Sequence, residues 1–219
     1  MAETETPAWW PALRYLTHGV QALILGVAIY ALASFKVGEA INVGIPVAIA
    51  AVPTLLRYAY GYRINPVLGL WIALSAGLHV GGSLGLYQSI GWYDQLAHAV
   101  SASLVAGIGY AVVRALEETH EEIVIPSRLR FVFLFVIATA FGVLWEVGEF
   151  ASGQAAAVMG GKAVLAQYGL SDAVLDIGFD AVGALVVAAV GTSYFRPVTR
   201  LFRGESADHG EGTAGESDS

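Results

Sequence analysis

Acidic and histidine side chains recur at helical spacing inside apolar stretches of this chain. Asp94 and His98 are separated by one helical turn, and a D-x3-D-x3-D pattern repeats at the same spacing further along. Side chains three or four residues apart share one face of an α-helix, so each group would project in a single direction. The candidate site residues are His79, Asp94, His98, Glu146, Glu149, Asp172, Asp176 and Asp180.

These residue types are suited to binding a metal ion. Carboxylates with one or two imidazoles can hold Mg²⁺, Mn²⁺, Zn²⁺ or non-haem iron, and the sequence does not choose among these metals. Ionised carboxylates in an apolar medium are costly unless they are hydrated, protonated or paired with a cation. We therefore predict a divalent metal site, with Glu146 and Asp180 as candidate catalytic acid or base groups. For Asp94 and Asp172, the alternative is stabilisation of a helix N-terminus.

The sequence around these residues predicts an all-α, polytopic membrane helix bundle. Hydrophobic residues make up 56% of the 219 positions, charged residues only 13%, and the mean hydropathy is +0.64. A helix needs about 20 apolar residues to cross the hydrocarbon core of a bilayer. Six segments meet this requirement, at about 13–35, 41–61, 66–86, 93–115, 130–150 and 173–195. They form one predicted transmembrane domain over 1–203, followed by a disordered acidic tail at 204–219.

The distribution of basic residues predicts how these spans are oriented. Nine of the eleven Lys and Arg residues would lie on one side of the membrane, and only Lys36 and Lys162 on the other. Basic residues are enriched in cytoplasmic loops, so both termini are expected in the cytoplasm and the protein in the cell (inner or plasma) membrane. The loops at 36–40, 87–92 and 151–171 would then face outward. This topology places the candidate ligands near the outer face.

Charge and motifs exclude several other classes. The net charge of -7 argues against a nucleic-acid-binding surface, and membrane lipid is the expected partner. The chain has no cysteine, which excludes disulfides and thiolate metal ligands. It also has no Walker loop, dinucleotide fingerprint or HExxH motif. The acidic run EETHEE at 117–122 is interpreted as a solvated loop.

Three motifs resemble known membrane proteins: YDQLAH at 93–98, WEVGE at 145–149 and DAVLDIGFDAVG at 172–183. Their succession resembles the YjdF-like family of bacterial and archaeal inner-membrane proteins and, more distantly, the VanZ-like membrane proteins. The polar positions of the family would fall on Asp94, His98, Glu146, Asp176, Asp180 and Gly183. The resemblance covers roughly the last three predicted spans and implies no particular reaction. VanZ-like proteins are linked with glycopeptide resistance, which suggests envelope chemistry.

Three functions remain open from the sequence. The first is a metal-dependent enzyme acting on a lipid or isoprenoid substrate, with the carboxylates and His98 as ligands or acid/base groups. The second is a cation or proton transporter, although the inner halves of the predicted spans are nearly free of acids. The third is a structural membrane protein whose acids cap helices.

Overall fold

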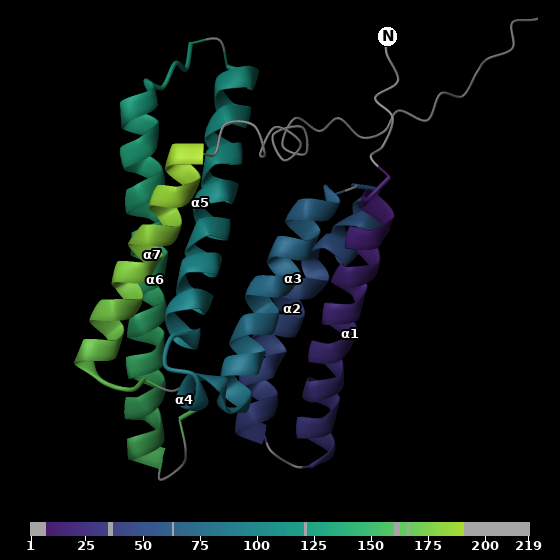
Figure 1. The fold of residues 1–219 in the computed structure, drawn as a ribbon, viewed down its shortest axis with the longest axis vertical. Helices are drawn as coiled ribbons and strands as arrows, with labels where there is room; N and C mark the ends of the chain where they lie inside the picture. Colours follow the sequence, from purple (N-terminus) through teal and green to yellow (C-terminus); the bar gives the residue numbers. More distant parts are fainter. Residues whose placement is uncertain are drawn as a thin grey trace, which may run out of the picture.

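The computed structural model describes residues 8–34, 37–62, 64–120, 122–159, 163–165 and 167–190. These residues form helices and no strand, which confirms the predicted all-α class. Six long helices run up and down in alternation (Figure 1). The predicted tail at 204–219, and the loop residues Lys36 and Lys162, lie outside the described residues.

The first three long helices follow local sequence signals. Helix α1 (Trp10–Ala33) has a proline in its first turn, where the missing N–H is tolerated. Helix α2 (Val37–Tyr60) continues through Pro46 and Pro53. Helix α3 (Pro66–Gly81) is capped by Asn65, whose Oδ1 accepts a hydrogen bond from the Val67 N–H at 2.8 Å.

A short irregular segment links α3 to the second half of the chain. The π-helical turn η1 (Gly82–Leu86) leads into the single turn α4 (Tyr87–Ser89). Gly85 has a φ of +118°, a conformation that favours glycine because it has no Cβ. The third predicted span, 66–86, therefore extends to Ser89 but is interrupted near its end.

The last three helices are α5 (Tyr93–Thr119), α6 (Ser127–Met159) and α7 (Leu170–Val190). Helix α6 exceeds the predicted span 130–150, so the predicted loop 151–171 begins as helix. Its 33 residues correspond to about 50 Å at 1.5 Å per residue. The segment that follows α6 folds back onto this helix. The Oγ of Ser152, within α6, accepts hydrogen bonds from the backbone N–H groups of Val164 and Leu165.

The helices form two groups of three, α1–α3 and α5–α7, that lie side by side (Figure 1). Helix α3 packs against both groups and joins two apolar cores. One core includes Ala76 and Val80 of α3 with residues of α1 and α2. The other includes Leu68 and Ile72 of α3 with residues of α5, α6 and α7. Together these contacts hold the two groups as one bundle.

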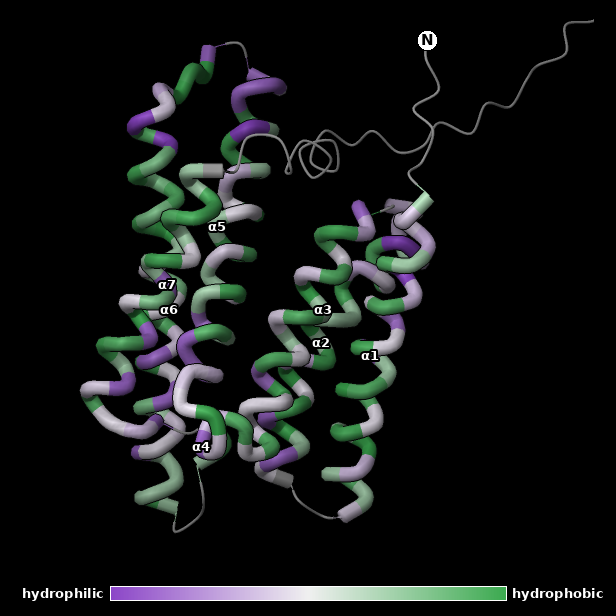
Figure 2. The backbone as a smooth tube through the Cα atoms, viewed as in Figure 1, coloured by the Kyte–Doolittle hydropathy of each residue, from purple (hydrophilic) through white to green (hydrophobic). Residues whose placement is uncertain are grey.

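Within the described residues, five helical segments are long and apolar enough to cross a membrane: α1, α2, the segment from α3 to α4, α5 and α6. Helix α7 covers residues 173–190 of the sixth predicted span and carries three aspartates, and it is not among these five; residues 191–195 of that span lie outside the described residues. Many large hydrophobic side chains are exposed around the bundle, as expected for surfaces that contact lipid. Figure 2 shows hydrophobic residues along the helices and hydrophilic segments near both ends of the bundle.

The end of the bundle that contains the α5–α6 connection is held by ion pairs. Glu117 is 2.8 Å from Arg114 and 2.6 Å from Arg130, and its Oε1 also accepts a hydrogen bond from the Ile125 N–H. Its side chain is only 9% exposed. The first residue of the EETHEE run is therefore a largely enclosed structural anchor at the end of α5, which differs from the solvated loop expected from the sequence.

Candidate metal centre

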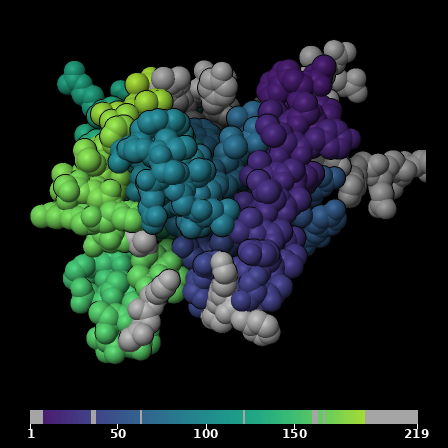
Figure 3. Space-filling view, turned by 60° about the horizontal axis from the view of Figure 1, so that its bottom comes forward, coloured from purple at the N-terminus to yellow at the C-terminus, as the bar shows by residue number. Residues whose placement is uncertain are grey.

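Three helices meet at one end of the bundle and carry most of the candidate ligands. Helix α5 begins there, α6 passes through, and α7 begins there, as the topology predicts (Figure 1). Figure 3 views the molecule with this end turned forward. The segment from α3 to α5 occupies the middle of that face, with α1 and α2 on one side and α6 and α7 on the other.

His98 is the centre of the cluster. Its Nδ1 lies 3.2 Å from Asp180 Oδ1, within hydrogen-bonding distance. Its Nε2 lies 3.8 Å from Asp94 Oδ1 and 3.9 Å from Glu146 Oε1. The side chain is 11% exposed, so the imidazole is largely enclosed by carboxylates from three helices.

Asp176 completes the cluster. One ligand atom each from Asp94, His98 and Asp176 lies within 4.8 Å of the other two. Asp176 is 1% exposed, Asp180 3% and Glu146 6%. Each of these three carboxylates has one buried oxygen without a hydrogen-bond partner among the described residues: Asp176 Oδ1, Asp180 Oδ2 and Glu146 Oε1. Such atoms are costly to bury, so this arrangement calls for a further partner.

Two glycines allow the helices to approach closely at this level. A Cβ at Gly142 of α6 would overlap the Asp180 carboxylate, so the glycine leaves the space that this side chain occupies. A Cβ at Gly183 of α7 would overlap the backbone carbonyl of Ala99 in α5. Close contact between α5 and α7 therefore depends on Gly183, and it places Asp180 beside His98.

The distances around His98 Nε2 fit a metal ion better than direct hydrogen bonds. Separations of 3.8 and 3.9 Å are too long for hydrogen bonds. An ion with bonds of about 2.1 Å keeps neighbouring ligand atoms roughly 3–4 Å apart. A hydrogen bond from Nδ1–H to Asp180 would leave the Nε2 lone pair free for the metal, as is usual for metal-binding histidines. Asp94, His98 and Asp176 are thus the best-placed candidate ligands, with Glu146 adjacent.

The other predicted ligands lie differently. Glu149 accepts a hydrogen bond from Trp145 Nε1 at 3.0 Å, on its own helix. Asp172 lies in the first turn of α7, one turn before Asp176. Neither belongs to the group of atoms within 4.8 Å.

His79 has a separate environment on α3. Its Nε2 lies 2.8 Å from Asn42 Oδ1, and its Nδ1 lies 3.3 Å from the Tyr87 hydroxyl. The Trp145 ring packs edge-on against it with centroids 5.0 Å apart. Both ring nitrogens of His79 therefore already have partners. The structure places this histidine in the contact between the two helix groups rather than in the cluster.

Sequence reasoning did not identify two residues at the site. Gln167, in the segment before α7, lies with its Nε2 3.4 Å from Glu146 Oε2. Gly142 makes room for Asp180. A glutamine in a connecting segment gives no distinctive sequence signal, and Gly142 resembles the other glycines of the spans.

The fold and the cluster define a multi-pass helical membrane protein with a candidate carboxylate and histidine site. A family model described as "Predicted membrane protein (DUF2238)" matches residues 13–197, and the chain belongs to this family. The match covers all six predicted spans, whereas the motif resemblance covered the last three. It is consistent with the YjdF-like resemblance, while the relation to VanZ-like proteins stays a prediction.

One curated relative is similar to part of the chain. It is an "Uncharacterized protein" from Thermotoga maritima, 26% identical over 140 residues. The alignment covers 58% of this chain and 66% of the relative, slightly less than two thirds of its length. No solved structure matches the chain.

Proposed function

We propose that the protein is a metal-dependent membrane enzyme that acts on a phosphate-bearing lipid or isoprenoid. One observation carries the proposal: buried, unpartnered carboxylate oxygens of Asp176 and Glu146 accompany a histidine whose other ring nitrogen is held by Asp180. A divalent cation would neutralise two negative charges and give these oxygens a partner. No Lys or Arg of the described residues forms an ion pair with these carboxylates.

Each residue of the cluster has a distinct proposed role. Asp94, His98 and Asp176 would hold the metal, because their ligand atoms are mutually closest. Asp180 is a positioning residue, since it fixes the orientation of the His98 ring. Glu146 would act as the general base, with Oε2 held by Gln167 and Oε1 left free toward the cluster. A bound metal would polarise a phosphoryl oxygen and lower the pKa of a bound water.

The depth of the site supports a lipid substrate. The cluster lies within helices whose outer surfaces are apolar and exposed, so its surroundings are hydrocarbon and headgroups. Lipid phosphates and isoprenoid phosphates carry their reactive group at this level of a bilayer. Three protein ligands also leave coordination positions open for water and substrate.

Elemental analysis of the purified protein in detergent tests the metal site. We expect about one equivalent of a divalent metal in the wild type and its loss in the double variant His98→Ala, Asp176→Ala. Glu149→Gln is the matched control, because it changes an acid of the same layer outside the 4.8 Å group. Equal metal content in the wild type and the double variant would refute the metal site.

Activity is tested separately by release of inorganic phosphate from phosphatidic acid and a long-chain polyprenyl diphosphate in mixed micelles. Glu146→Gln should retain the metal and lose turnover, because the amide cannot accept a proton. If Glu146→Gln is as active as the wild type, Glu146 is not the base. If the metal-loaded wild type releases no phosphate from either substrate, the proposed reaction class is wrong, whatever the metal content.

A further inference from the structure

A polar cavity lies at the opposite end of the bundle from the carboxylate cluster. It has a volume of about 200 Å³, many times the roughly 10–15 Å³ that holds one water. Most of its lining comes from the start of α1, the end of α2 and the start of α3. These three segments lie together in the first helix group (Figure 1). The cavity is therefore separate from the candidate metal centre.

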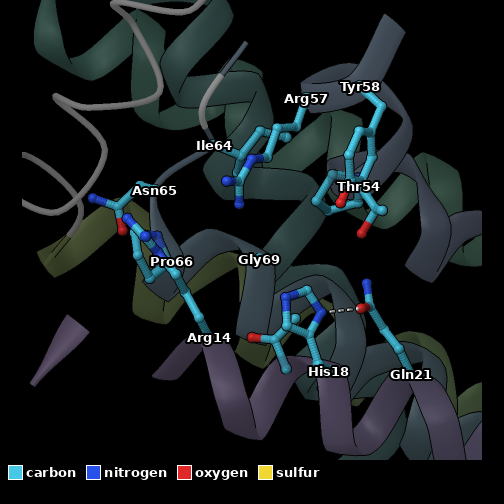
Figure 4. A pocket seen from close by; sticks show the side chains of 12 residues that line it. Arg14, His18, Gln21, Thr54, Arg57, Tyr58, Ile64, Asn65, Pro66 and Gly69 are labelled. Atoms are coloured by element: carbon cyan, nitrogen blue, oxygen red, sulfur yellow. Dashed lines mark hydrogen bonds between the residues drawn. The ribbon is translucent and has the colours of Figure 1, made fainter. Parts of the chain in front are cut away.

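The lining of this cavity is basic. Of the twelve lining residues, two are arginines, Arg14 and Arg57, which carry permanent positive charge, and none is acidic. In the described part of the chain, neither arginine has an ion-pair partner. Figure 4 shows Arg14 and His18 extending from α1 and Arg57 from α2 toward the same space. Two guanidinium groups around one cavity, with no acidic residue among those lining it, favour an anionic ligand.

Hydrogen bonds fix the polar groups at the floor of the cavity. Gln21 Nε2 donates to the backbone carbonyl of Ala50 at 2.6 Å, which links α1 to α2. Its Oε1 is therefore an acceptor, and His18 Nδ1, 2.9 Å away, must be the donor (Figure 4). The ring of His18 is held in place with Nε2 available.

The N-terminus of α3 adds to the positive potential. Asn65 and Pro66 line the cavity at the first turn of this 16-residue helix. Pro66 has no N–H and the Val67 N–H donates to Asn65, so the contribution of this N-terminus is that of the helix dipole, which favours negative charge. The dipole and the two arginines thus act in the same direction, from three different helices.

We infer that this cavity is a binding site for a phosphate group. Guanidinium groups recognise phosphate oxygens in pairs, and arginines from two helices would contact a tetrahedral anion from two sides. Basic pockets between the ends of transmembrane helices bind the headgroups of anionic lipids. The phosphate could belong to such a headgroup or to a soluble phosphate compound. This inference does not depend on the proposed metal chemistry.

Binding is tested on the full chain with both phosphate sources. Phosphatidylglycerol retained by the protein is measured by native mass spectrometry after exchange from nanodiscs, with phosphatidylcholine for comparison. Inorganic phosphate and glycerol 3-phosphate are titrated against the protein in detergent, with the melting temperature as readout. Retention of phosphatidylglycerol identifies a lipid headgroup as the source, and stabilisation by the soluble compounds identifies a free phosphate.

The variant Arg14→Gln, Arg57→Gln should bind the effective ligand at least about tenfold more weakly, because two charged donors are lost. Arg128→Gln is the matched control, since Arg128 is exposed at the same end of the bundle but does not line the cavity. Size-exclusion profiles and melting temperatures without ligand verify folding. Binding of neither phosphate source to the wild type would overturn the inference, and so would equal losses in the double variant and Arg128→Gln.

Discussion

Replacement of Gly183 by alanine tests whether close contact between α5 and α7 holds the carboxylate cluster together. The new Cβ would overlap the carbonyl of Ala99, which is backbone and cannot rotate away. Carbon and oxygen atoms normally approach to about 3.3–3.6 Å, so α7 must shift by on the order of 1 Å. His98 Nδ1 and Asp180 Oδ1, now 3.2 Å apart, would then leave hydrogen-bonding distance.

The expected magnitude follows from this clash. Overpacking of a closely packed site costs about 1–3 kcal/mol of unfolding free energy. For a chain of this size, that corresponds to a melting temperature roughly 2–12 °C lower. Loss of the His98 to Asp180 contact should also weaken divalent metal binding by about 10–100-fold, as for other residues that orient a metal ligand.

The matched control is Gly178→Ala, five residues earlier on the same helix. A Cβ at Gly178 meets no atom within 4 Å. Alanine also has a higher helix propensity than glycine, by about 1 kcal/mol. Its melting temperature should therefore be unchanged or higher, and its metal content unchanged.

Differential scanning fluorimetry and elemental analysis of both variants in the same detergent provide the measurements. Equal melting temperatures and equal metal contents for the two variants would refute the reasoning, because the contact at Gly183 would then have no energetic role. A lower melting temperature with full metal content for Gly183→Ala would show that the cluster does not depend on this contact.

Two further predictions follow from other contacts. Asp180→Asn should lower the affinity for a divalent metal about 10–100-fold, measured by isothermal titration, because Asp180 orients the His98 ring. Glu146→Gln is the control and should keep the wild-type affinity. Equal affinities for Asp180→Asn and the wild type would contradict the role of Asp180. Glu117→Gln should lower the unfolding free energy by about 1–3 kcal/mol in thermal or denaturant melts, because Arg130 and the Ile125 N–H lose a charged acceptor. Exposed Glu122→Gln is its control, and similar losses for both would argue against the anchor.

The convergence of the candidate ligands could be predicted from the sequence. Helical spacing places Asp176 and Asp180 on one face of α7, and alternating spans bring the start of α5, the later part of α6 and the start of α7 to the same end. Helical spacing fixes the direction of a side chain, and the alternation of the spans fixes its depth. They explain why Asp94, His98 and Glu146 meet in the structure.

Helical spacing and the order of the spans do not fix which helices are in contact. The side-chain environments that depend on those contacts could therefore not be predicted. His79 was expected near the same layer, but α3 directs it to Asn42 of α2 and to Tyr87. The rotation of α7 that brings Asp180 to His98 depends on contacts at Gly142 and Gly183. The motif resemblance includes Gly183, but periodicity does not distinguish Gly142 from the other glycines of the spans. The Glu117 side chain is largely enclosed because Arg130, on the other side of the α5–α6 connection, pairs with it.

The length of α6 has a consequence for how the protein sits in its membrane. A helix tilted by 40°, the upper end of the usual range, spans a 30 Å hydrocarbon core with about 39 Å of its length. Helix α6 is about 50 Å long, so about 10 Å or more of its length must lie outside the hydrocarbon core. Glu146 is 13 residues, or about 20 Å, from its far end at Met159. The excess length corresponds to about two helical turns, which together must lie among headgroups or in water at the ends of α6.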